Sequence, residues 1–277
     1  MQRELPHLEF LPINTLIIHE WHDNQRTPPL IKRIVESGIW RNPPIVAPLP
    51  DASGRYMVLD GANRFTAAQR MGLPDILVQV VPADSPGLRL HNWNHVVWGL
   101  DSAVLMQTLE QIPDTELAPS SPLVEPDLWG SCGLAQVHLP NGEMSALCTD
   151  AVELVRRTEM LNQLVNAYKD RAHLDRTSVR DIHQLKGDYP DLCGLVVFPN
   201  FKVSEVMALA GQGYLLPAGI TRFMVAPRAL HLNYPLSELQ SDKALVEKNL
   251  ELRRWLQGRI ASKGIRYYAE PTFLFDE

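Results

Sequence analysis

In the first part of the chain, short apolar runs alternate with helical patterns. Apolar runs bounded by turn-forming residues predict strands, and apolar positions about one helical turn apart predict helices. We expect strands within 8–18, 43–47, 55–59 and 76–81, and helices at 28–38 and 63–72 that end at Gly38 and Gly72. This alternation predicts a compact mixed α/β (α+β) unit.

The later part of the chain has a less regular pattern. Asn141-Gly142 is a strong turn signal and predicts a hairpin of residues 129–139 and 143–148. The stretch 114–128, rich in proline, serine and glutamate, predicts an interdomain connector or a mobile lid. We expect further helices at 103–109, 150–168, 182–185, 204–211 (with Ser204 as N-cap) and 245–260, and strands at 193–198 and in the tail 265–275.

The stretch from Tyr56 to Gly72 predicts a buried strand, a tight turn at Asp60-Gly61 and a helix. The N–H groups of a helix start attract anions, a glycine allows close approach, and Arg64 adds a bidentate donor. These residues indicate a phosphate site. An ordinary strand–turn–helix, in which Asp60 caps the helix and Arg64 is solvated, explains the same pattern equally well.

Three further stretches carry candidate chemistry. His19-Glu20-Trp21-His22-Asp23 follows a predicted strand, where α/β proteins often place functional groups, although an exposed loop would also be polar. Residues 91–98 hold two histidines and two tryptophans, which suit either a pocket wall or a strand with core aromatics. Residues 215–223 end in Thr221-Arg222-Phe223, where an arginine can grip a carboxylate or phosphate or can simply be exposed.

Composition narrows the class of protein. The net charge of -6 and the pI near 5.9 argue against a nucleic-acid-binding protein. No apolar run is long enough to span a bilayer, and we find no apolar signal segment, so we expect no membrane association. The three cysteines form no C-x-x-C pair, which favours free thiols in a cytoplasmic protein. Without a second cluster of ligand residues, we expect no zinc site.

The motif Asp60-Gly61-x-Asn63-Arg64-x-x-Ala67 resembles the D-G-x-H/N-R-x-x-A signature of the ParB/sulfiredoxin superfamily, whose members bind nucleotide phosphates at this turn. The resemblance covers residues 8–81. Within the superfamily, the chain is most similar to the free L-serine kinase branch. Three features carry this likeness: the His19-Glu20 pair, the Trp/His segment 91–98, and the segment Pro217-Ala218-Gly219-Ile220-Thr221-Arg222.

The resemblance implies a kinase that phosphorylates free L-serine to O-phospho-L-serine, with ATP favoured over ADP as donor and Mg²⁺ as cofactor. It implies a nucleotide-binding domain at 1–90, a second α/β domain at 91–277, and an active site in the cleft between them. Glu20 would be the general base and Asp60 would hold the metal. The implied phosphate cradle is Gly61, Ala62, Asn63 and Arg64, and the implied ligands of the amino acid or product phosphate are Trp93, His95, Thr221 and Arg222.

Other members of the superfamily suit the sequence less well. A sulfiredoxin needs a nucleophilic cysteine where this chain has Ala62, and a DNA-partitioning protein needs a basic helix-turn-helix after Val81. A non-catalytic sensor that binds a nucleotide or another small ligand remains the alternative. The sequence leaves open whether serine or another small hydroxyl compound is the acceptor, and what the oligomeric state is.

Overall fold

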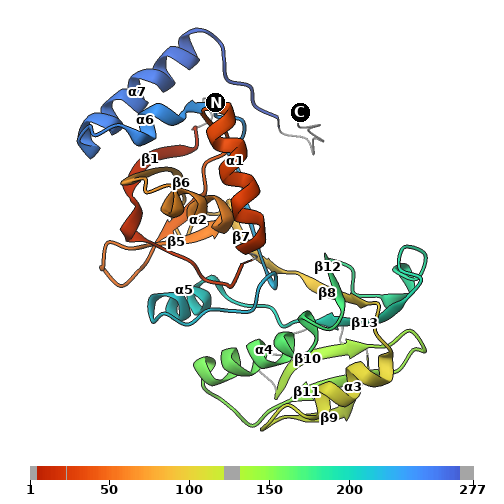
Figure 1. The fold of residues 1–277 in the computed structure, drawn as a ribbon. Coiled ribbons are helices and arrows are strands. Elements are labelled where there is room, and N and C mark those ends of the chain that lie inside the picture. Colours follow the sequence, from red (N-terminus) through yellow and green to blue (C-terminus); the bar gives the residue numbers. More distant parts are fainter. Residues whose placement is uncertain (1–4, 23, 122–131, 269–277) are drawn as a thin grey trace.

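Two β-sheets organise the chain in a computed structural model that describes residues 5–22, 24–121 and 132–268 (Figure 1). The first sheet has the strand order β1-β6-β4-β5-β2. Its strands are β1 (His7–Pro12), β2 (Leu16–Ile17), β4 (Ile45–Pro48), β5 (Tyr56–Asp60) and β6 (Asp75–Val80). The pairs β1–β6 and β4–β5 are antiparallel, whereas β2–β5 and β4–β6 are parallel.

Two helices of the first sheet's unit lie where the sequence predicts them. Helix α1 (Thr27–Ser37) has prolines in its first turn and ends at Gly38 in the left-handed conformation, with φ 62°. Helix α2 (Ala62–Arg70) follows β5 directly, and the chain leaves it through Gly72, which has φ 69°. Two short 3-10 turns, Ile13–Thr15 and Asn24–Arg26, complete the connections.

The second sheet has the order β12-β8-β13-β10-β11-β9. Helices α3 (Ser102–Glu110) and α4 (Leu154–Lys169) pack against it through β13 and β10. The β10–β11 hairpin lies where the sequence predicts it. The strands are β8 (Asn94–Trp98), β9 (Glu116–Pro119), β10 (Gly133–His138), β11 (Met144–Cys148), β12 (His173–Thr177) and β13 (Leu192–Val197), with a 3-10 turn at Ile182–Gln184.

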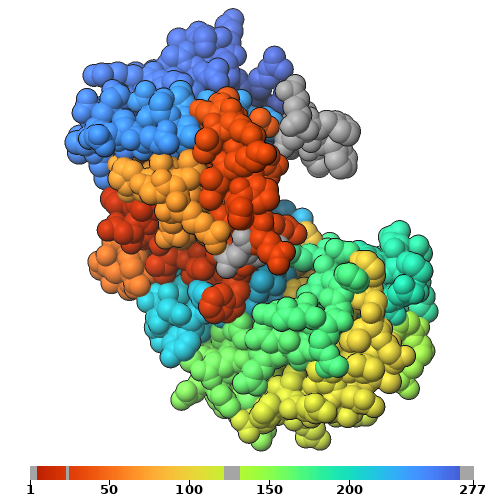
Figure 2. All heavy atoms as spheres, in the orientation of Figure 1, coloured from red at the N-terminus to blue at the C-terminus, as the bar shows by residue number. Residues whose placement is uncertain are grey.

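A two-stranded ribbon of β7 (Leu88–Asn92) and β14 (Thr221–Val225) lies between the sheets (Figure 1). Helix α5 (Val203–Gly211) contacts β5 of the first sheet and α4. In the space-filling view the molecule narrows between a lobe built on each sheet (Figure 2). The antiparallel register of the ribbon sets Thr221 opposite Asn92 and Arg222 opposite His91. Two segments that the sequence analysis singles out separately are therefore neighbours.

The C-terminal part of the described chain returns to the first sheet. Strand β15 (Tyr234–Pro235) pairs with β3 (Ile39–Trp40), and α6 (Leu236–Gln240) and α7 (Leu245–Ala261) pack beside it. Buried Lys248 donates a 2.9 Å hydrogen bond to Asp75 at the start of β6. The division at residue 90 stays a prediction, and any such division must place 234–261 beside the first sheet.

The mixed α/β class is confirmed, and most predicted elements are present. Three expectations need correction. Residues 116–119 of the predicted connector form an edge strand of the second sheet, whereas 122–128 lie outside the described residues. Helix α5 is preceded by Lys202 as N-cap rather than by Ser204. Residues 265–268 form no strand, and the rest of the predicted tail strand is outside the described residues.

Candidate active site

A cavity of about 550 Å³ lies where the ends of the first sheet meet the ribbon and the second sheet. Nine of the ten residues that the sequence analysis proposes for the site line it; His95 is the tenth. Asp23 lies outside the described residues. The lining side chains come from five stretches of chain: 19–30, 58–64, 93, 176 and 218–228.

Backbone pairing places Glu20 beside the 215–223 segment. The N–H of Trp21 donates to the Leu216 carbonyl at 2.9 Å, and the N–H of Leu216 donates to the His19 carbonyl at 2.9 Å. These two bonds form an isolated parallel bridge between Glu20 and Leu216, a short distance after β2. As a result, Oε2 of Glu20 accepts hydrogen bonds from the Thr221 hydroxyl at 2.7 Å and from the Gly219 N–H at 3.3 Å.

The imidazole of His19 is buried behind Glu20, with a relative exposure of 5%. Its Nδ1 lies 2.7 Å from the carbonyl oxygen of Val58 in β5, and its Nε2 lies 2.8 Å from Oγ1 of Thr221. The ring also packs edge-on against Phe223. His19 thus joins β5, the first-sheet strand that leads into the turn, to the ribbon strand β14.

At the Asp60-Gly61 turn, Gly61 is the N-cap of α2 and has φ 96°, a conformation that favours glycine. No described side chain caps this helix, which leaves the N–H groups of its first turn available, and the residues of that turn line the cavity beside Gly61. Asp60 does not cap the helix. Its Oδ2 instead accepts a 2.9 Å hydrogen bond from Arg64 and forms an ion pair with Arg228.

Arg64 is not a solvated side chain. Its guanidinium donates to the carbonyls of Asn42 at 2.9 Å and Pro43 at 3.4 Å as well as to Asp60. Burial lowers the pKa of Arg64, and the charge of Asp60 opposes that shift. Arg64 therefore ties the turn to the 42–43 segment, and only the part of its guanidinium that faces the cavity can meet a phosphate.

The second sheet and the ribbon contribute arginines to the cavity lining, Arg176 from β12 and Arg222 from β14. The guanidinium of Arg222 stacks on the ring of Trp93 at 4.2 Å from the centroid. Arg176, from β12, lies so close to Gly219 that a Cβ there would meet its Nε at 2.8 Å. Sequence reasoning missed Arg176 because the alternation in His173–Thr177 is too polar to predict a strand. These arginines suit an anionic ligand such as a carboxylate.

His95 lies behind the cavity wall rather than among its lining residues. Its Nε2 is 3.3 Å from the Gly219 carbonyl, and its Nδ1 is 3.0 Å from the hydroxyl of Tyr168. Burial lowers the pKa of His95 to about 4, so the ring is neutral near pH 7. A neutral ring satisfies both contacts when Nε2–H donates to the Gly219 carbonyl and Nδ1 accepts from the Tyr168 hydroxyl. His95 therefore helps to hold the backbone at Gly219 in place.

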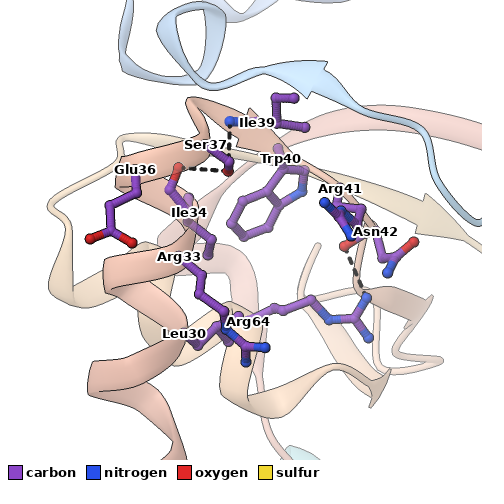
Figure 3. A pocket seen from close by; sticks show the side chains of 10 residues that line it. All are labelled: Leu30, Arg33, Ile34, Glu36, Ser37, Ile39, Trp40, Arg41, Asn42 and Arg64. Atoms are coloured by element: carbon purple, nitrogen blue, oxygen red, sulfur yellow. Dashed lines mark hydrogen bonds between the residues drawn. The ribbon is translucent and has the colours of Figure 1, made fainter. Parts of the chain in front are cut away.

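A second cavity of about 560 Å³ adjoins the first and shares Leu30 and Arg64 with it (Figure 3). Figure 3 shows it between α1 and the 39–42 segment, with the ring of Trp40 on one wall. Trp40 is held in place because its indole N–H donates to the Leu77 carbonyl at 3.1 Å. The start of α2 lies where the two cavities meet.

Within the described ranges, no group of three or more His, Cys, Asp or Glu side chains could form a metal cage. The Asp60-Gly61 turn nevertheless offers oxygen ligands for a metal ion, since Asp60 lines the cavity and the buried Oδ1 of Asn63 has no hydrogen-bond partner among the described residues. One or two protein oxygens are what Mg²⁺ uses when it arrives with nucleotide phosphates. The residues therefore fit a nucleotide-borne Mg²⁺.

The fold is that of the free serine kinases. It matches a free serine kinase in complex with AMP with a TM-score of 0.70 at 15% identity, covering 86% of this chain and 95% of that one. It also matches C-terminally truncated SbnI from Staphylococcus aureus with a TM-score of 0.70 at 23% identity, over 94% and 98% of the two chains.

The sequence likeness extends over almost the whole chain. The ATP-dependent L-serine kinase SbnI of Staphylococcus aureus (strain NCTC 8325 / PS 47) is 25% identical to this chain over 281 residues, 98% of each protein. No protein-family profile matches the chain. The resemblance to the free serine kinases predicted from the sequence is confirmed. No helix among the described residues combines the length and apolar character needed to cross a bilayer.

Proposed function

We propose that this protein is a free L-serine kinase that transfers a phosphoryl group from a nucleotide, with ATP favoured, to the serine hydroxyl. The observation that carries the proposal is one cavity that brings a carboxylate, a helix start and an arginine-rich wall together. Phosphoryl transfer to a hydroxyl requires these parts and little covalent chemistry from the protein. The full-length likeness to an ATP-dependent L-serine kinase supports the same activity.

Each part of the site then has a role. The N–H groups after Gly61 would hold the transferred phosphate, and Glu20 would accept the proton of the serine hydroxyl. Arg176 and Arg222 would bind the serine carboxylate, since both line the cavity, one from β12 and the other from β14. Asp60 and Asn63 would hold Mg²⁺, which neutralises phosphate charge when it is bound.

The nucleoside of the donor would occupy the second cavity. That cavity meets the first at Arg64, beside the start of α2, so a nucleotide lying across the junction would place its terminal phosphate in the first cavity (Figure 3). The ring of Trp40 and the side chain of Leu30 offer apolar contact for the nucleobase. We propose that the units 1–90 and 91–277 meet at this site, the first binding the nucleotide and the second completing the serine pocket.

The test is ³¹P NMR of the purified protein with Mg²⁺ and L-serine, with ATP and ADP in separate samples. A phosphoserine resonance identifies both the activity and the donor. The Glu20→Gln variant loses activity by about a hundredfold or more if Glu20 is the base. Glu110→Gln, an exposed site at the end of α3, is the matched control. Nucleotide binding without phosphoserine in either sample would support the sensor alternative instead.

A further inference from the structure

The hydroxyl of Thr221 bridges His19 and Glu20, and its single hydrogen constrains the protonation of both. Oγ1 lies 2.8 Å from Nε2 of His19 and 2.7 Å from Oε2 of Glu20. On the other side of the ring, Nδ1 lies 2.7 Å from the Val58 carbonyl. A carbonyl oxygen can only accept, so Nδ1 carries a hydrogen. Whether Nε2 also carries one depends on the direction of its hydrogen bond with Thr221.

Two arrangements satisfy every contact. In the first, Thr221 donates to Glu20 and accepts from Nε2–H, so that His19 is an imidazolium and Glu20 a carboxylate. In the second, Glu20 carries the proton and donates to Thr221, which donates to a neutral His19. Both hold the same number of protons. They interconvert when the Nε2–H and Oγ1–H bonds break while new Oγ1–H and Oε2–H bonds form.

The backbone selects between these arrangements. The N–H of Gly219 also donates to Oε2 of Glu20, at 3.3 Å, so in the first arrangement this oxygen accepts two hydrogen bonds. An ionised carboxylate oxygen is a stronger acceptor for this N–H than the hydroxyl oxygen of a carboxylic acid, which in the second arrangement would donate to Thr221 while it accepts from Gly219. The imidazolium–carboxylate arrangement therefore fits the geometry better.

We propose that Thr221 and buried His19 are positioning residues that hold Glu20 as an ionised base, with the His19 imidazolium as its counter-charge. The proposal rests on the proposed function for the role of Glu20 as base. In this proposal Thr221 is a hydrogen-bond partner of the general base rather than a ligand of the amino acid. While Oε2 is held by Thr221 and Gly219, the other carboxylate oxygen takes the proton as the serine O–H bond breaks.

Other charged groups line the same cavity as His19. Asp60 is paired with Arg64 and Arg228, whereas Glu20 is linked to His19 through the hydroxyl of Thr221. The remaining charged or titratable groups on elements around the cavity are His22, Arg26, Arg176 and Arg222.

A spectroscopic test does not depend on turnover. In ¹H–¹⁵N spectra of histidine-labelled protein near pH 7, His19 is assigned by the signal lost in His19→Gln. The wild-type ring should carry hydrogens on both nitrogens, whereas the ring in Glu20→Gln should be neutral with its hydrogen on Nδ1. A neutral ring in the wild type, or the same ring state in both proteins, overturns the proposal.

A kinetic test separates positioning from substrate binding. Thr221→Val should lower kcat about tenfold or more with the KM for serine nearly unchanged, and Thr221→Ser should keep kcat within about threefold. Thr158→Val, which removes a buried hydroxyl bonded to the Leu154 carbonyl in α4, controls for stability. A raised KM for serine with kcat retained would make Thr221 a substrate ligand. Failure of the wild type to form phosphoserine would refute the kinase assignment and leave the spectroscopic result standing.

Discussion

Gly61 lies directly against the guanidinium of Arg64. A Cβ built on Gly61 would sit 2.9 Å from Nη2 of Arg64 and 3.1 Å from Cα of Pro44. The glycine therefore serves two purposes, since its φ of 96° forms the turn and its missing side chain leaves room for the arginine. The proposed phosphate cradle depends on this contact because Arg64 fixes the turn to the 42–43 segment.

Replacing Gly61 with alanine should destabilise the protein and weaken nucleotide binding. The positive φ and the contact with Arg64 together should cost about 1–3 kcal/mol in the free energy of unfolding. Because the added Cβ would displace Arg64 and the turn, at least one hydrogen bond to phosphate should lose its geometry, which should weaken nucleotide affinity about tenfold. Denaturant unfolding and calorimetric titration with nucleotide measure the two effects.

Gly72→Ala is the matched control for this change. Gly72 also has a positive φ, 69°, but no heavy atom lies within 4 Å of its added Cβ. It should lose about 1 kcal/mol of stability and keep nucleotide affinity. Equal loss of affinity in the two variants would show that the Gly61–Arg64 contact has no specific role in binding.

The assignment of the second cavity to the nucleoside predicts a selective effect of Ser37→Trp. Ser37 lines that cavity and not the first one, so an indole there should fill space that the nucleoside needs. We expect the KM for ATP to rise about tenfold or more, which corresponds to roughly 1.4 kcal/mol of lost binding, with little change in the KM for serine.

Lys32→Trp adds the same side chain to an exposed position of α1 that lines neither cavity, and it should leave both constants near the wild-type values. Should Ser37→Trp raise only the KM for serine, the second cavity would belong to the acceptor instead of the donor.

Buried His95 should make the protein less stable in mild acid. Burial lowers its pKa to about 4 in the folded state from about 6.5 in the unfolded state. Between these values the unfolded chain binds a proton that the folded protein does not. The unfolding free energy should therefore fall as the pH drops from about 6.5 to about 4, by up to about 3 kcal/mol from this group.

Denaturant unfolding at several pH values measures this fall, which should be smaller in His95→Gln. His183→Gln, at an exposed position of the 182–184 turn, should keep the wild-type pH dependence. An identical fall in His95→Gln and wild type would mean that His95 titrates alike in the folded and unfolded states.

Local signals in the sequence were sufficient to predict much of the fold. Gly38 and Gly72 mark helix ends because the end of a helix is decided by the few residues that follow it. Both glycines adopt the positive φ that this position favours. Asn141-Gly142 marks the β10–β11 hairpin for the same local reason. The strand at 116–119 escaped prediction because its pairing with β11, rather than its own composition, makes it a strand.

The partners within the site could not be predicted in this way. The sequence pointed to Glu20 and Thr221 separately, but their hydrogen bond joins residues 201 positions apart. Arg176 carried no motif and reaches the cavity only because β12 pairs with β8. The commitment of Arg64 to backbone carbonyls depends on where the 42–43 segment passes, which a pattern of residue types does not specify.

The return of the chain to the first sheet has a consequence for synthesis on the ribosome. The carboxylate of Asp75 is buried beside Lys248, and Trp40 pairs through β3 with a strand that starts at Tyr234. A nascent chain that carries the complete Asp60-Gly61 turn still lacks the residues that close the sheet behind it. The proposed nucleotide-binding half therefore acquires these contacts only after residue 248 has been synthesised.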